Sequence, residues 1–245
     1  MKAVFITDLH GDVKSLERVL KYGEERDIEA IIIGGDIGPF LEVMKNPDQS
    51  VIQSQREFLE EHLIPRIKKF KKRFKEKNIF IIMGNDDFEV NMDVLNEAEK
   101  EGVLKVMHKK VEKLGDKYII GYSYVNPMPF FLKDWEKPEE YIERDLEYLG
   151  KMTDPKKTIW LFHDTPFDTA LDMIHNGQHV GSVAIKRFIN ETQPMLTLHG
   201  HIHESPEVSG RIYERLGSTI SVNPGNKYFV IFDIDNPEDM VVIKR

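Results

Sequence analysis

Five short apolar runs, each followed by a cluster of Asp, Asn, His or Gly, constrain the fold of this chain most strongly. The runs and the polar residues that follow them are 3–7 before Asp8 and His10, 30–33 before Asp36, 79–83 before Asn85 and Asp86, 158–162 before His163, and 195–198 before His201 and His203. Short runs of apolar and β-branched residues bounded by Gly, Asp and Asn predict buried strands. Because the apolarity is continuous and does not alternate, we expect both faces of these strands to be covered.

Three segments between the runs carry helical spacing of apolar residues. They are 13–26, 51–77, which we expect to be interrupted at Pro65, and 180–190, which we expect to begin near Ser182. Alternation of strands and helices predicts a largely parallel sheet with helical covers. The carboxyl ends of parallel strands meet at one edge of a sheet, so the five polar clusters are expected to converge there.

The C-terminal part has a different pattern, with short strands joined by Gly, Asn and Pro turns. The predicted strands are 211–214, 219–222, 228–235 and 240–244, and together with 111–114 and 118–122 they could form a second, more antiparallel sheet. The chain has no internal repeat and no low-complexity linker that would divide it. We therefore predict one domain over residues 1–245.

Composition excludes several classes of protein. The chain has no cysteine, so disulfides and thiolate metal sites are absent. A net charge of −8 argues against a protein that coats nucleic acid, although bound cations would reverse the local field and admit a small phosphorylated substrate. The first residues become polar too soon for a signal peptide, and no apolar run reaches the length of a membrane span. By elimination, we expect a cytoplasmic protein without a membrane partner.

The polar clusters together predict a metal site. On an extended chain, residues two apart point the same way, so Asp8 with His10, and His201 with His203, could each reach one ion. One such residue alone is weak evidence, because Asp and Asn commonly cap helices or form turns. Oxygen and imidazole ligands suit Mn, Fe, Zn, Co or Ni. Seven candidate ligands exceed what one ion needs, whereas two ions sharing a bridging carboxylate could use them all.

The order of the clusters resembles that of a known family. The set Asp8-Leu9-His10-Gly11, Gly35-Asp36, Gly84-Asn85-Asp86, His163 and Gly200-His201-Ile202-His203 resembles the calcineurin-like metallophosphoesterases. Residues 163–166 and 221–225 look like the small microbial branch of that superfamily. The resemblance covers most of the chain and weakens over 38–77 and 124–157.

The resemblance implies a binuclear phosphoesterase in a four-layer α-β-β-α sandwich, an α/β fold of two mixed sheets flanked by helices. It implies that the first metal is held by Asp8, His10 and His203, the second by Asn85, His163 and His201, and that Asp36 bridges them. A metal-bound hydroxide would attack phosphorus in line. Manganese is among the metals expected.

One position departs from the family pattern. Many members carry His directly after the Asn of the third block, where it assists the leaving group, but this chain has Asp86. With Asn85 and His163, Asp86 completes our set of candidate catalytic residues. An Asp near two cations is expected to be ionised and to be a poor general acid unless another group raises its pKa. We therefore expect a preference for phosphodiesters or activated esters over alkyl monoesters.

Other polar residues have simpler interpretations. His199 is expected to pack behind the site, Asp12 and Asp87 to begin turns or cap helices, and Asp164 either to orient His163 or to cap locally. The loop around His175 and His179 forms either a pocket wall or a surface loop. The apolar segment 127–131 with Trp135 caps the pocket, contacts a second copy or packs under a loop.

Two alternative functions stay open. The basic stretch 66–77 is the only support for a nuclease acting on short nucleic-acid ends. A non-catalytic scaffold of the same fold would be expected to lack some metal ligands, and none is missing here. The sequence predicts neither the oligomeric state nor the physiological substrate.

Overall fold

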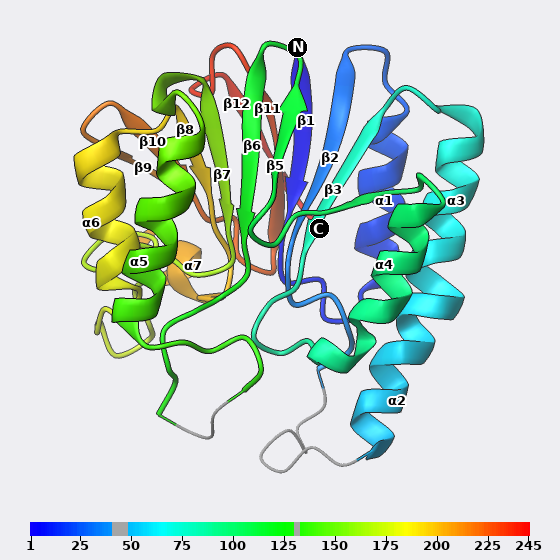
Figure 1. Ribbon diagram of the computed structural model, residues 1–245, viewed down its shortest axis with the longest axis horizontal. Helices are drawn as coiled ribbons and strands as arrows, with labels where there is room; N and C mark the ends of the chain where they lie inside the picture. Colours follow the sequence, from blue (N-terminus) through cyan, green and yellow to red (C-terminus); the bar gives the residue numbers. More distant parts are fainter. Residues whose placement is uncertain (41–48, 130–132) are drawn as a thin grey trace.

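Two facing β-sheets, each covered by helices on its outer side, form the body of the molecule (Figure 1). The computed structural model describes residues 1–40, 49–129 and 133–245, and over these residues each sheet has six strands. Residues 41–48, within the stretch 38–77 where the resemblance weakens, lie outside the described residues, as do Phe130 and Phe131 of the apolar segment 127–131. The four layers are those of the predicted α-β-β-α sandwich.

The first sheet has the strand order β12-β11-β1-β2-β3-β4. Its strands are β1 (Lys2–Ile6), β2 (Ile28–Gly34), β3 (Asn78–Ile82), β4 (Lys105–Val106), β11 (Tyr228–Asp233) and β12 (Met240–Lys244). From β1 to β4 the strands are parallel, while β11 pairs antiparallel with both β1 and β12. The sheet is therefore mixed.

The second sheet has the order β5-β6-β7-β8-β10-β9. Its strands are β5 (Val111–Leu114), β6 (Lys117–Tyr122), β7 (Thr158–Phe162), β8 (Leu196–Leu198), β9 (Tyr213–Leu216) and β10 (Thr219–Val222). Its four central strands are parallel and its two edge strands antiparallel.

The predicted division of strands between the sheets was wrong in two respects. Strands β7 and β8, which we expected in one sheet with β1, β2 and β3, lie at the centre of the second sheet. Strands β11 and β12, which we expected in the second sheet, lie in the first. Local pattern predicts that a segment is a strand, but its neighbour is chosen by long-range packing. The carboxyl ends of β1, β2, β3, β7 and β8 still share one end of the molecule, the lower end in Figure 1.

Helices cover the outer faces. Against the first sheet lie α1 (Val13–Gly23), α2 (Gln49–Glu57), α3 (Ile64–Arg73) and α4 (Met92–Lys100), and against the second lie α5 (Glu139–Leu149) and α6 (Val183–Thr192). The short helix α7 (Ser205–Ser209) follows the last polar cluster. Helices α4 and α5 were not predicted. Ser182 caps α6 by accepting a hydrogen bond from the Ile185 N–H, as predicted.

We predicted that Pro65 interrupts its helix, and this was wrong, because the helix continues through it. A π-helical turn, η2 (Phe58–Leu63), joins α2 directly to α3, and Pro65 lies in the first turn of α3. Proline lacks an N–H donor and its ring crowds the preceding turn. The wider π turn accommodates the proline without ending the helix.

Side chains of one strand alternate between two cores. Ala3 and Phe5 pack between the sheets, whereas Val4 and Ile6 pack under α1 and its neighbouring helices. All four are fully buried, which explains the unbroken apolar run. No helix within the described residues is long and apolar enough to cross a membrane.

Candidate metal centre

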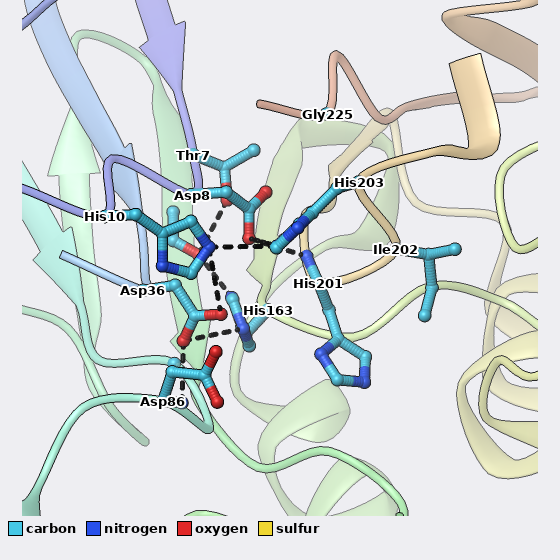
Figure 2. A network of polar contacts seen from close by, with 12 residues as sticks. Thr7, Asp8, His10, Asp36, Asp86, His163, His201, Ile202, His203 and Gly225 are labelled. Atoms are coloured by element: carbon cyan, nitrogen blue, oxygen red, sulfur yellow. Dashed lines mark hydrogen bonds and ion pairs between the residues drawn. The ribbon is translucent and has the colours of Figure 1, made fainter. Parts of the chain in front are cut away.

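The loops at the carboxyl ends of β1, β2, β3, β7 and β8 bring all seven predicted ligands to one site. Figure 2 shows Asp and His side chains of these loops converging, Asp86 of the loop after β3 among them. Among the described residues, two groups have ligand atoms within 4.8 Å of one another: Asp8, His10, Asp36 and His203 in one, and Asp36, His163 and His201 in the other. Asp36 belongs to both groups, as a bridging carboxylate would.

The first group is drawn together by short contacts between rings and carboxylates. The His10 Nε2 lies 3.0 Å from the His203 Nε2 and 3.9 Å from Asp36 Oδ2. The His203 Nε2 also lies 3.3 Å from Asp8 Oδ1. Asp8 and Asp36 are almost fully buried, while the two histidines are partly exposed. This group therefore opens toward solvent.

The second group is more deeply buried. The His163 Nε2 lies 3.3 Å from Asp36 Oδ1 and 3.1 Å from Asn85 Oδ1. Its other ring nitrogen, Nδ1, lies 2.8 Å from the Gly34 carbonyl oxygen, which fixes the ring and keeps Nε2 directed at the cluster. Asn85 thus lies beside this group, where the resemblance placed it.

Three buried polar atoms of the cluster have no hydrogen-bond partner in the part of the chain that the structure describes: Asp8 Oδ2, His10 Nδ1 and His201 Nε2. A buried polar atom without a partner is unfavourable by about 1–3 kcal/mol, so such atoms need an explanation. They are oxygen and imidazole donors of the kind that binds divalent transition metals. The donor set and its unpaired atoms fit metal ions at this site.

The backbone at the site is strained. Asp8, His10, Asp36 and His201 all have positive φ angles, between 44° and 66°, which are uncommon for residues other than glycine. The spacing argument for Asp8 and His10 was therefore wrong about the local chain, which is not extended there. Left-handed turns direct both side chains into the site, and such strain concentrates at functional sites.

The electrostatics of the cluster keep its carboxylates ionised. Burial raises the pKa of Asp8, but His203 outweighs this and lowers the pKa to about 2. Burial acts likewise on Asp36, and His163 holds its pKa well below the usual range. Burial lowers the pKa of His163, but Asp36 raises it to about 10. Burial and the charge of His163 lower the pKa of His201 to about 3. The buried, ionised carboxylates of Asp8 and Asp36 therefore attract cations.

Asp87 holds two of the site loops together. The Asp87 carboxylate accepts hydrogen bonds from the N–H groups of Ile37, Gly38 and Gly84, which ties the loop after β2 to the loop after β3. This is a larger role than the predicted turn or cap. Asp12 does cap α1, accepting from the Ser15 N–H.

Arg245 supports the loop after β1. Its guanidinium donates to the carbonyl oxygens of Thr7, Asp8, Gly225 and Tyr228. Sequence reasoning missed this residue, because nothing in its local pattern marks it. Burial lowers its pKa to about 10.

The remaining polar candidates lie outside the two groups. His199 is fully buried, stacks on Phe162 and pairs through its ring nitrogens with the Asp164 carbonyl and Thr197 Oγ1. The Asp164 carboxylate accepts locally from the Thr165 N–H, and it also accepts from the distant Asn126 N–H, which joins its loop to the connection after β6. His179 pairs with Asp172 inside its own loop. Trp135 is buried, so it packs under its loop.

Asp86 has a partner that the sequence did not indicate. Its carboxylate Oδ1 accepts a 3.1 Å hydrogen bond from Asn85 Nδ2 and pairs with the ammonium of Lys133. Burial and the nearby Asp36 raise the pKa of Asp86 above its usual value, and Lys133 offsets only part of the rise. Lys133 lies in the connection between β6 and α5, far from the metal clusters in sequence, where no pattern marks it.

The four layers, and the carboxylate–imidazole cluster at the carboxyl ends of the strands, fit a metal-dependent hydrolase. The profile of the calcineurin-like phosphoesterases matches residues 1–205, and the chain belongs to this family. It is thus a metallophosphoesterase, a hydrolase of phosphoric esters.

Individual proteins are similar to this chain in sequence or in fold. The chain is 26% identical to the uncharacterized protein MJ1162 of Methanocaldococcus jannaschii, over 99% of this chain and 95% of that protein. It shares the fold of TT1561 of Thermus thermophilus, with a TM-score of 0.68 and 16% identity over 99% of this chain and 98% of that one. A dimetal phosphatase from Danio rerio matches with a TM-score of 0.58 and 10% identity, over 100% and 96% of the two chains.

Proposed function

We propose that this protein is a binuclear-metal-dependent phosphoesterase that hydrolyses small phosphorylated substrates. One observation carries the proposal: two groups of Asp and His ligand atoms share Asp36, and three of their buried atoms lack a partner among the described residues. We assign Asp8, His10 and His203 to one ion, and Asn85, His163 and His201 to the other. Mn, Fe, Zn, Ni and Co all suit these donors.

When bound, such ions lower the pKa of a coordinated water toward neutrality and neutralise charge on the phosphoryl group. The residues of the chain fix where this happens. Gly34 orients the His163 ring through its carbonyl oxygen, and the Asp86 N–H donates a 2.8 Å hydrogen bond to Asp36 Oδ1. These bonds hold the shared carboxylate and the imidazole in position for in-line displacement at phosphorus.

We further propose a preference for phosphodiesters and activated esters. The proposal rests on Asp86, which stands where a protonated side chain would assist a leaving group. Its Oδ1 accepts from Asn85 and pairs with Lys133. Burial and Asp36 raise the pKa of Asp86, and the ammonium opposes that rise, so we take the paired carboxylate as ionised. An ester whose leaving group needs no proton is then hydrolysed faster than an alkyl ester, which must expel an alkoxide.

The test combines metal analysis with a substrate panel. The wild type and His201→Ala are purified, reconstituted with Mn, Ni or Mg and analysed for bound metal. Bis-p-nitrophenyl phosphate, p-nitrophenyl phosphate, an alkyl phosphate and cyclic nucleotides are then compared as substrates. We expect metal uptake by the wild type, reduced uptake by His201→Ala, and slow hydrolysis of the alkyl ester. Absence of metal from the wild type would overturn the function, and equal rates on the alkyl ester would overturn the preference.

The nuclease alternative draws little support from the basic stretch. Arg66, Lys68 and Arg73 pair with Glu17, Glu101 and Glu24. The basic end of α3 also lies near the upper end of the molecule in Figure 1, whereas the site lies at the lower end. Salt-dependent binding of oligonucleotides would revive this alternative. Cytoplasmic location stays a prediction from the sequence.

A further inference from the structure

Lys133 and Asp86 form an ion pair with little access to solvent. Their side chains are 15% and 9% exposed. Taking both charges out of water is costly, and their attraction alone does not ensure a net gain in stability. A pair of this kind beside a catalytic centre is therefore a candidate for a role in function.

The pair is one side chain away from the candidate metal centre. The Asp86 N–H donates to Asp36 Oδ1, and the same Asp86 oxygen that pairs with Lys133 accepts from Asn85 Nδ2. Figure 2 shows Asp86 beside Asp36. The ammonium is thus held on the Asn85 side of the cluster.

The loop that carries Lys133 is anchored by other contacts. Asp134 accepts a 2.9 Å hydrogen bond from the Glu89 N–H, and Trp135 is buried among aromatic rings. Main-chain hydrogen bonds also join Val125 to Trp135 and to Lys137. The segment therefore has its own attachments, and holding the loop is not a sufficient reason for a buried ammonium.

The charges around the site explain what a cation does there. Asp36, Asp86 and the buried Glu136 all carry carboxyl groups close to Lys133 or to its partner. An unpaired carboxylate at position 86 would repel a phosphoryl group. An ammonium both cancels that charge and offers three N–H donors, which makes lysine a common phosphate-binding residue.

We propose that Lys133 contacts the substrate, its ammonium donating to a phosphoryl oxygen on the Asn85 side of the site, and that Asp86 is the positioning residue that holds it there. The inference rests on the proposed phosphoesterase function and names a residue that binds the phosphoryl group. No proton leaves Lys133 in this role. It acts as a fixed positive charge, and it forms and breaks no covalent bond during hydrolysis.

The test measures binding of inorganic phosphate, which does not depend on turnover. Metal-reconstituted wild type, Lys133→Met, Lys133→Arg, Asp86→Asn and the double variant Lys133→Met/Asp86→Asn are titrated with phosphate by calorimetry, and their bound metal is measured. Lys137→Met is the matched control, because its ammonium lies over the Tyr124 ring and not at Asp86. The same proteins are assayed on bis-p-nitrophenyl phosphate.

We expect Lys133→Met to weaken phosphate binding about tenfold or more, with metal content unchanged, and Lys133→Arg to restore much of the loss. Asp86→Asn should weaken binding in the wild-type background but strengthen it in the Lys133→Met background, where the carboxylate only repels. A purely structural pair would not give this reversal of sign.

If Lys133→Met binds phosphate as tightly as the wild type, or loses no more phosphate affinity than Lys137→Met, the inference is overturned. The proposed function then still stands. Loss of metal from Lys133→Met would also overturn the inference. If the wild type takes up no metal, the proposed function fails, whereas the difference in phosphate affinity between wild type and Lys133→Met still decides the role of Lys133.

Discussion

The carboxylate of Asp87 accepts hydrogen bonds from the main-chain N–H of Ile37, at 2.9 Å to Oδ1 and 3.1 Å to Oδ2. Ile37 directly follows Asp36, and Asp87 lies two residues beyond Asn85. The same carboxylate also binds the N–H groups of Gly38 and Gly84. One buried side chain therefore sets the distance between the loops that carry two of the candidate ligands.

Asp87→Ala should remove this connection. Three buried N–H groups lose their acceptor, so we expect a loss of about 3 kcal/mol or more in the free energy of unfolding. Metal affinity should fall about 10–100-fold, as is typical when a support of a metal ligand is removed. Urea unfolding and metal titration measure the two effects.

Asp154→Ala is the control for Asp87→Ala. Asp154 also accepts a main-chain hydrogen bond, from the Lys156 N–H, but lies in the exposed turn before β7. We expect a cost of about 1 kcal/mol and unchanged metal affinity. Equal metal affinity in wild type and Asp87→Ala would show that the loops hold their geometry without Asp87.

Arg245→Lys should weaken the loop after β1. A lysine ammonium cannot reproduce the planar fork that reaches the carbonyls of Thr7, Asp8 and Gly225. We expect a loss of about 2 kcal/mol in stability, because hydrogen bonds from charged donors contribute about 1.5–3 kcal/mol each and lysine keeps some of them. Thermal unfolding and metal titration provide the measurement, with weaker metal binding expected.

Arg18→Lys is the matched control for Arg245. The Arg18 guanidinium donates a 2.8 Å hydrogen bond to the Lys244 carbonyl at the surface. Its loss should change stability by about 0.5 kcal/mol or less. Equal effects of the two substitutions would contradict a specific role for Arg245.

Gly84→Ala should disrupt the site by steric conflict. A Cβ at this position would lie 2.2 Å from Asp36 Oδ1 and 2.5 Å from the Asp36 main-chain nitrogen. Asp36 must move, so we expect metal binding and hydrolysis to be lost, with a destabilisation of about 1–3 kcal/mol. In Gly102→Ala, where nothing lies within 4 Å of the added Cβ, only the positive φ of 72° costs stability, and metal binding should be retained. Full metal uptake by Gly84→Ala would refute the close approach.

His108 should make stability depend on pH. Burial, followed by the charge of Lys109, lowers its pKa to about 3 despite the opposing Asp145, whereas in the unfolded chain it is about 6.5. Between these values the unfolded chain binds a proton that the folded chain does not. The contribution is therefore present above pH 6.5 and is lost as pH falls, by about 2 kcal/mol at pH 5.

His108→Phe isolates this contribution. Phenylalanine keeps the packing against Tyr124 and Trp135 but removes the acceptor of the Ser123 N–H bond, so the variant should be less stable by about 1–3 kcal/mol at pH 7. Its deficit should shrink toward pH 5, because the variant has no imidazole to protonate. Urea unfolding of both metal-free proteins at the two pH values tests this, and a constant difference would count against a neutral His108.

Much of the candidate site could be predicted from the sequence. Asp8, Asp36, Asn85, His163 and His201 each lie within three positions of the end of a short apolar run, and parallel strands carry their carboxyl ends to one edge. Strand type and ligand type are local properties, so pattern alone predicts them. The order of the clusters along the chain was enough to predict the family.

The arrangement of the strands was decided by tertiary packing. The pattern of β7 resembles that of β3, yet β7 lies in the other sheet, because the choice of neighbour depends on how two complete sheets bury their faces. The turn that directs Asp8 and His10 into the site likewise could not be predicted from their spacing in the sequence. It follows from left-handed backbone that the surrounding loops stabilise.

The sequence by itself predicted the candidate metal ligands and determined which family this chain belongs to. The tertiary structure decided what supports and surrounds them: Asp87 between two loops, Arg245 beneath Asp8, and Lys133 against Asp86. These contacts join residues 47 to 237 positions apart in the chain. A hydrogen bond or ion pair of that range leaves no periodic trace in sequence, because only the folded backbone brings its partners within reach.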